Sequence, residues 1–364
     1  MPGGLVATEA TGRRIGIAAR LPIRKIILWV LSILIIVGVI LGSRATLQEG
    51  AYSAANWRDF VILGVAQGSL YALIAMGYTL VYGILFMINF AHGEVFMAGA
   101  FTSFFLARPL AESGFLNSNP VIAIGVLILF SILISVVTAV LLERIAYRPL
   151  RGAPRLVPLI TAIGASLFLQ NTFRGFFGAR VRGYPIPEAL RGRWDIFGLP
   201  ILRTQFLAIV GAALLVVALY YLITRTRTGR SMRAVGEDKE IAALMGINVD
   251  RVIVTTFVIG GGLAGAAGVL WALVAQQVNF FMGFFPGIKA FTAAVLGGIG
   301  NVVGAAVGGL ILGVLESVAP FLLLEGAGVP SVNQIKDAVA FTVLVLVLIF
   351  RPGGILGSAE EEKA

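Results

Sequence analysis

Long apolar runs separated by short polar segments extend over most of the chain. A helix that crosses a membrane needs about 20 mainly apolar residues at a rise of about 1.5 Å per residue. By this measure the pattern predicts about ten membrane segments. They are Ile26–Gly42, Phe60–Gly83, Val95–Leu106, Val121–Leu142, Leu156–Phe176, Gln205–Thr224, Val252–Ala275, Ile288–Gly300, Val302–Leu323 and Ile335–Phe350.

Two of these segments, Val95–Leu106 and Ile288–Gly300, are too short to cross a membrane by themselves. Irregular backbone at membrane depth is tolerated where it is buried in protein or lines a cavity. Transporters use such interrupted helices around the path of their substrate. We therefore expect broken or half-helices at both places.

The composition supports membrane insertion, because 58% of the 364 residues are apolar and only 13% are charged. Globular domains contain about 25% charged residues, so this chain lacks the polar surface that a soluble protein needs. The absence of cysteine excludes disulfides, iron–sulfur clusters and thiolate zinc sites, and His92 is the only histidine. The predicted fold class is an all-α polytopic membrane protein without a metal site.

Basic residues distinguish two sides of the membrane. The net charge is +10, and if all ten segments cross, most lysines and arginines fall on one side. Cytoplasmic loops are enriched in these residues, so we expect both termini in the cytoplasm. The predicted parts are an N-terminal extension (1–25), one transmembrane domain (26–350) with a cytoplasmic segment (225–251), and a cytoplasmic tail (351–364).

The first apolar run has two interpretations. A cleaved secretory signal has a shorter apolar run, followed by a cleavage site of small residues. Here the run Ile26–Gly42 is long, and Arg44 lies where that site would be. An uncleaved first helix is therefore favoured.

The longest external segment, residues 178–203, contains Pro185, Pro187 and Pro200, which favour irregular structure. It is also basic, which argues mildly against an external position. A surface that meets an external partner and a solvated cap explain this segment equally well.

Glycines recur at four-residue spacing, a pattern that lets membrane helices pack closely. In addition, Gly64–Phe101 resembles Gly260–Leu296, since each runs from a glycine-rich helix into a broken one. Such internal repeats are common in transporters. The spaced glycines are Gly64 and Gly68, Gly261 and Gly265, and Gly300, Gly304 and Gly308.

The cytoplasmic segment contains a short predicted helix with signals at both ends. Glu237 and Asp238 can cap its N–H groups, and Gly246 can adopt the left-handed conformation that ends a helix. Docking into a groove of a cytoplasmic protein is favoured over a solvated amphipathic loop, because one face is apolar. That face consists of Ile241, Leu244 and Met245.

A second polar stretch interrupts the apolar runs at Asn89, His92 and Glu94. Ionisable groups at membrane depth are costly and mark a functional path or a buried pair. A half-helix that begins here would direct N–H groups into a cavity. A path for substrate and a purely structural role for these side chains are equally supported.

Other polar residues lie within the predicted segments. We expect Arg174 and Lys289 to lie near segment ends and to extend toward the interface. Glu316 would pair with a neighbouring helix. The remaining ones are Gln67, Gln170, Asn171 and Asn301.

The sequence contains no phosphate-binding loop of the G-x-x-x-x-G-K-[ST] type, no H-E-x-x-H zinc motif and no nucleophile elbow. The chain is therefore expected not to hydrolyse ATP or to act as an enzyme. If transport is driven, the energy must come from a partner or an ion gradient.

Three passages carry a resemblance to a known family: residues 64–77 with Gly-Ser-Leu-Tyr-Ala-Leu, the string Asn-Phe-Ala-His-Gly-Glu at 89–94, and segment 229–246 followed by the glycine-rich run 260–268. Over about residues 58–356 the chain resembles the H-type membrane permeases of bacterial branched-chain amino-acid ABC importers. The resemblance implies an ABC importer permease bundle in the bacterial inner membrane. It also implies that this chain binds no cofactor, because ATP is used by partner subunits.

The implied partners are a second, M-type permease, two cytoplasmic ATPases and an external substrate-binding protein. Segment 229–246 is similar to the coupling motif that such permeases press into the ATPase, although Ile241 separates the glutamate from the alanine pair. The implied coupling residues are Glu237, Asp238, Glu240, Ala242, Ala243, Leu244, Met245 and Gly246. The expected translocation path includes Asn89, His92, Gly93, Glu94, Gly297 and Gly298.

Two alternatives stay open. Permeases of this type also serve importers of urea, short amides or other amino acids. An ion-coupled secondary transporter would need carboxylates deep in the bundle, for which Glu94 and Glu316 are the candidates. It would leave the capped cytoplasmic helix without a function.

Overall fold

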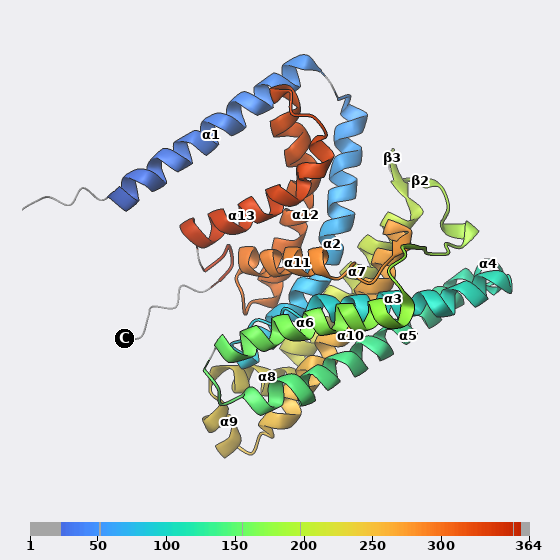
Figure 1. Ribbon diagram of the computed structural model, residues 1–364, viewed down its shortest axis with the longest axis vertical. Coiled ribbons are helices and arrows are strands. Elements are labelled where there is room, and N and C mark those ends of the chain that lie inside the picture. Colours follow the sequence, from blue (N-terminus) through green and yellow to red (C-terminus); the bar gives the residue numbers. More distant parts are fainter. Residues whose placement is uncertain (1–22, 51, 155, 197, 352, 358–364) are drawn as a thin grey trace, which may run out of the picture.

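The computed structural model describes residues 23–357 apart from residues 51, 155, 197 and 352 (Figure 1). The predicted N-terminal extension lies almost entirely outside the described residues, as do residues 358–364 of the predicted tail. Each of the ten predicted segments corresponds to a helix. These are α1 (Ile23–Glu49), α2 (Ala54–Leu85), α3 (His92–Glu112), α5 (Pro120–Leu142), α6 (Leu156–Phe177), α7 (Arg203–Arg225), α10 (Val249–Ala275), α11 (Phe284–Gly297), α12 (Val302–Leu324) and α13 (Lys336–Phe350).

Within the described residues, seven helices are long and apolar enough to cross a membrane, namely α1, α2, α5, α6, α7, α10 and α12. Helix α11 has only 14 residues, which agrees with the predicted short segment. Helix α3 has 21 residues and is longer than the predicted apolar segment, but it is not among the seven helices that are both long and apolar enough to cross. Its polar ends, from His92 at the start to the Arg108–Glu112 ion pair, are helical but fall outside the apolar run.

Glycines bring the central helices into direct backbone contact. A Cβ atom on Gly64 would lie 2.7 Å from the Cα of Val314, and one on Gly68 would lie 2.8 Å from the Gly309 carbonyl oxygen, so α2 packs closely on α12. On the other side of the bundle, Gly265 of α10 accepts a hydrogen bond of 2.7 Å from the Ser131 hydroxyl of α5. The interpretation of the spaced glycines as packing positions is confirmed except for Gly300, where nothing lies within 4 Å of a Cβ atom.

The two predicted repeats have the same order of elements. Helix α2 ends at Phe86 and α10 ends at Gln276, and both residues are left-handed, with φ of 53° and 58°. After each break a second helix begins, α3 or α11. The two starts meet, because a Cβ atom on Gly93 would lie 2.4 Å from the carbonyl oxygen of Gly283.

The segment 178–203 is more regular than its prolines suggested. Strand β1 (Arg182–Gly183) pairs with β4 (Gln277–Val278), and β2 (Arg193–Ile196) pairs with β3 (Leu199–Leu202), both antiparallel. Pro200 lies inside β3, where a strand with one free edge tolerates the missing N–H group. This hairpin lies at the end of the molecule opposite the helices α8 (Arg227–Glu237) and α9 (Lys239–Leu244) (Figure 1). A short helix, α4 (Phe115–Ser118), connects α3 to α5.

Candidate functional site

Residues 225–251 form two helices, α8 and α9, in place of the single short helix that the sequence predicted. The residue between them is Asp238, whose carboxylate accepts hydrogen bonds of 2.8 and 2.9 Å from the N–H groups of Glu240 and Ile241. Glu237 does not cap α9, because it is the last residue of α8. Past the end of α9, Gly246 is left-handed with a φ of 82°, as predicted.

The apolar face of α9 is exposed. The exposed fractions are 60% for Ile241, 86% for Leu244 and 78% for Met245. Ala242 lies on the opposite face and is buried, whereas Glu240 and Ala243 are exposed. One face of this short helix therefore holds it on the bundle, and the other is available to a partner.

Helices α8 and α9 contact the C-terminal end of α2 directly. Val235 and Met232 of α8 are buried, and a Cβ atom on Gly236 would lie 2.7 Å from the carbonyl oxygen of Gly83. The ammonium group of Lys239 lies 5.9 Å from the centre of the Phe86 ring. A displacement of α9 would thus be transmitted to the residues where α2 ends and the first break begins.

The polar residues of the first break are buried and hydrogen-bonded to other helices. The Tyr147 hydroxyl donates a hydrogen bond of 2.6 Å to Asn89. The Glu94 carboxylate, only 1% exposed, accepts hydrogen bonds of 2.7 Å from the Gln170 amide and 3.2 Å from the Ser166 hydroxyl, both on α6. Its other oxygen, Oε2, is buried without a hydrogen-bond partner.

His92 is equally buried, with 2% exposed. Its Nε2 atom has no hydrogen-bond partner, and its ring meets Tyr78 edge-on at 5.0 Å between centres. A Cβ atom on Gly77 would lie 2.2 Å from this Nε2 atom, so the imidazole occupies the space that the glycine leaves. Among the described residues, His92 and Glu94 thus each have one buried polar atom without a hydrogen-bond partner beside the start of α3.

The junction between α11 and α12, at Gly297 and Gly298, is closed by the segment that follows α13. Residues Ile355 and Leu356 donate backbone hydrogen bonds of 2.8 and 3.0 Å to Leu296 and Gly297. Gly298 has a φ of 107°, which a glycine adopts without strain. The structure therefore brings Asn89, His92, Gly93 and Glu94 together, whereas Gly297 and Gly298 contact α12 and the C-terminal segment instead.

A charged cluster within the bundle was not predicted. Lys289 of α11 is 5% exposed and lies between Glu316 of α12, at 2.7 Å, and Asp337 of α13, at 2.6 Å. The expected pairing of Glu316 is confirmed, but the expected position of Lys289 at an interface is wrong. Arg174 does lie near the end of α6 and is exposed, 5.8 Å from the Phe280 ring centre. Charges within three adjacent apolar segments were the only sequence signal for the cluster.

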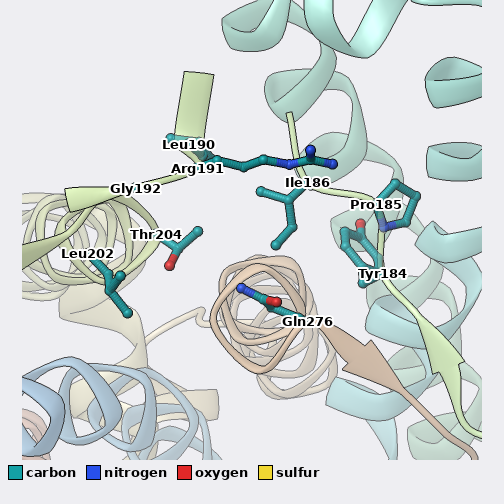
Figure 2. Close-up of a pocket in the computed structure, with 9 residues that line it drawn as sticks. All are labelled: Tyr184, Pro185, Ile186, Leu190, Arg191, Gly192, Leu202, Thr204 and Gln276. Atoms are coloured by element: carbon teal, nitrogen blue, oxygen red, sulfur yellow. The ribbon is translucent and has the colours of Figure 1, made fainter. Parts of the chain in front are cut away.

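A cavity of about 470 Å³ lies where the segment 178–203 meets the ends of α7 and α10. Figure 2 shows Arg191 and Gln276 on opposite sides of this cavity, with Tyr184 and Thr204 beside it. Tyr184 is fixed by its backbone hydrogen bond to Gln276, 2.9 Å long, and by its hydroxyl, 3.0 Å from that of Ser103. Across the described part of the chain, no group of three or more metal-ligating side chains gathers.

The fold and the buried polar break can now be compared with known proteins. A family model described as "Branched-chain amino acid transport system / permease component" matches residues 60–348. The chain belongs to this permease family. Membership of the branched-chain amino acid permease family confirms the resemblance seen in the sequence, the helical membrane fold, and a function in transport rather than catalysis.

Relatives of this branched-chain amino acid permease are similar along nearly their whole length. The high-affinity branched-chain amino acid transport system permease protein LivH of Salmonella typhimurium is 45% identical over 305 residues, which cover 82% of this chain and 95% of LivH. The corresponding protein BraD of Pseudomonas aeruginosa is 46% identical over 308 residues, covering 83% and 96%. A probable branched-chain amino acid transport permease protein LivH of Methanocaldococcus jannaschii is 25% identical over 297 residues. No solved structure matches this chain.

Proposed function

We propose that this permease takes up branched-chain amino acids as a membrane subunit of an ATP-driven importer in the bacterial inner membrane. The support for this substrate class is the 45% and 46% identity to LivH and BraD, whose names state it. A transport assay that finds uptake of urea or a short amide, and none of leucine, isoleucine or valine, would contradict this assignment.

The observation that carries the proposal is the exposed apolar face of α9. Leu244 and Met245 are among the most exposed apolar side chains of the molecule, yet they lie on the basic side, beyond the ends of the spanning helices. Exposed apolar surface outside the membrane marks an interaction site. We assign this face to a groove on one of two cytoplasmic ATPases, so the side that carries α9, together with both termini, is cytoplasmic.

Glu240 and Ala243 are exposed beside this face and contact the same ATPase, while Ala242 holds α9 on the bundle. Closure of the ATPases on ATP moves α9, and its contacts with Gly83 and Phe86 carry the movement to the first break. The permease pair, this chain and an M-type partner, then rocks and opens the path for the amino acid. An external binding protein delivers the substrate to the opposite side, where residues 178–203 lie.

The path passes the first break. The N-termini of α3 and α11 meet at Gly93 and Gly283, and helix N-termini favour a carboxylate such as that of an amino acid. Glu94 and His92, each with a free buried polar atom, lie beside that point. Gly297 and Gly298, at the junction between α11 and α12, are the other residues assigned to the path.

The test is Met245→Glu, with Met245→Leu as its matched control. Met245 is 78% exposed, so neither substitution disturbs the packing of the bundle. The glutamate places a charge in the apolar contact and is expected to abolish co-purification of the ATPases, while membrane insertion stays normal. The leucine variant should retain the ATPases. Equal recovery of ATPases with Met245→Glu and the unaltered protein would refute the docking assignment.

A further inference from the structure

A groove with a volume of about 230 Å³ separates α9 from the first break. Its walls are mainly apolar, with Phe86 and Met87 from the break and Val249 and Ile253 from α10. The charged side chains that line it are two cations, Arg151 and Lys239. The groove thus combines an apolar interior with positive charge.

Of the two cations that line this groove, only Arg151 is paired with carboxylates. Arg151 forms ion pairs with Glu143 and Asp250, and Arg148 shares Asp250. For the ammonium group of Lys239, the described residues provide no carboxylate within ion-pair distance. Burial and the neighbouring Arg151 lower the pKa of Lys239. Two carboxylates therefore pair with the two arginines, Lys239 has no carboxylate partner among the described residues, and an anion at the groove would complete the cluster.

The lining also restricts the chemistry of that anion. The side chains that line the groove offer cations and no carboxylate, which favours an anion over a free zwitterionic amino acid. An anion that carries an apolar chain fits this lining. Pro158, which lines the groove, lies in the first turns of α6, where Leu156 and Ile160 are 69% and 68% exposed. Ile145, six residues before Arg151 in the sequence, is 73% exposed. Exposed apolar helix surface next to the groove is suited to contact acyl chains.

We propose that this groove binds an anionic phospholipid of the inner leaflet, with its phosphate at Lys239 and Arg151 and an acyl chain along the start of α6. Basic pockets between membrane helices on the cytoplasmic side bind such headgroups. The lipid would connect the α8–α9 unit to Phe86 and so hold the coupling helix against the break. From the proposed function this inference takes only the orientation, namely that α9 lies on the cytoplasmic side.

The experiment uses the complete transporter in nanodiscs of phosphatidylcholine, with or without phosphatidylglycerol, and measures retained lipid by native mass spectrometry. Lys239→Gln is expected to weaken the retention of phosphatidylglycerol about fivefold, as removal of one basic residue at an anionic surface does. The control is Arg144→Gln, which removes an exposed charge nearby that does not line the groove and should change nothing. Ala153→Phe fills the groove without altering its charge and should act like Lys239→Gln.

Equal retention of phosphatidylglycerol by the unaltered protein and by both groove variants would overturn the proposal. So would a Lys239→Gln variant that loses ATPase but keeps the lipid, since the groove would then be covered by the ATPase. Retention is measured without transport, so an absence of amino-acid uptake in every lipid would count against the proposed function and not against the lipid site.

Discussion

The ammonium group of Lys289 on α11 lies 2.7 Å from a carboxylate oxygen of Glu316 on α12, and both side chains are almost fully buried. Asp337 binds the same ammonium group at 2.6 Å from α13, and the ring of Tyr71 on α2 lies 5.8 Å from it. Charges at membrane depth persist only where they are paired. The cluster therefore holds four helices in one arrangement.

Removal of the cation should be the most damaging change in this cluster. Lys289→Met leaves two carboxylates facing each other, so we expect the free energy of unfolding to fall by about 3–5 kcal/mol. The double variant Lys289→Met with Glu316→Gln should recover much of that loss, because only Asp337, which is 36% exposed, then stays charged. Melting temperatures of the detergent-solubilised protein measure both effects. A single variant as stable as the unaltered protein would show that the cluster does not hold the helices.

The contact between the starts of α3 and α11 depends on glycine. Gly93→Ala would place a Cβ atom 2.4 Å from the Gly283 carbonyl oxygen, and we expect this overpacking to cost about 1–3 kcal/mol of stability. Gly125→Ala on α5 is the matched control, because nothing lies within 4 Å of a Cβ atom there. It should be neutral or stabilising by less than about 1 kcal/mol. Thermal unfolding of the two variants compares them directly, and similar losses in both would contradict this account.

Helix α9 has six residues and depends on its cap. Asp238→Ala removes the hydrogen bonds to the N–H groups of Glu240 and Ile241, which should cost about 0.5–2 kcal/mol locally. Amide hydrogen exchange in residues 239–244 should become faster, and less ATPase should co-purify. Asp238→Asn retains an oxygen acceptor and should exchange nearly as slowly as the unaltered protein. Unchanged exchange in the alanine variant would mean that packing alone holds α9.

The hydroxyl of Tyr184 should lose its proton at an unusually high pH. Burial raises the pKa of its hydroxyl to about 12, although the hydrogen bond with Ser103 acts in the opposite direction. Because the folded pKa lies above the usual value, this contribution to stability is fully present below about pH 10 and is lost as the pH rises through about 12. The difference in tyrosinate absorbance between the unaltered protein and Tyr184→Phe should therefore appear near pH 12. A difference signal near pH 10 would indicate that the hydroxyl is solvated.

Local patterns predicted the features whose causes are local. Asp238 and Gly246 were identified as helix signals because a cap and a left-handed end act within a few residues. Gly64 and Gly68 were assigned to packing because a four-residue spacing places them on one helix face. Helix α3 was underestimated because apolar content indicates the part of a helix in lipid, whereas the hydrogen-bonded helix continues into polar residues such as Arg108.

The sequence by itself determined the membrane class, the ten apolar helical segments and local signals such as Asp238 and Gly246, since each follows from hydropathy or from backbone preferences of neighbouring residues. Only the tertiary structure decided which distant residues meet. It placed Lys289 against Glu316 and Asp337, Glu94 against Gln170, and Lys239 against Phe86. These pairs depend on how helices cross and rotate about their axes, which is set by the packing of many side chains at once and not by any one segment.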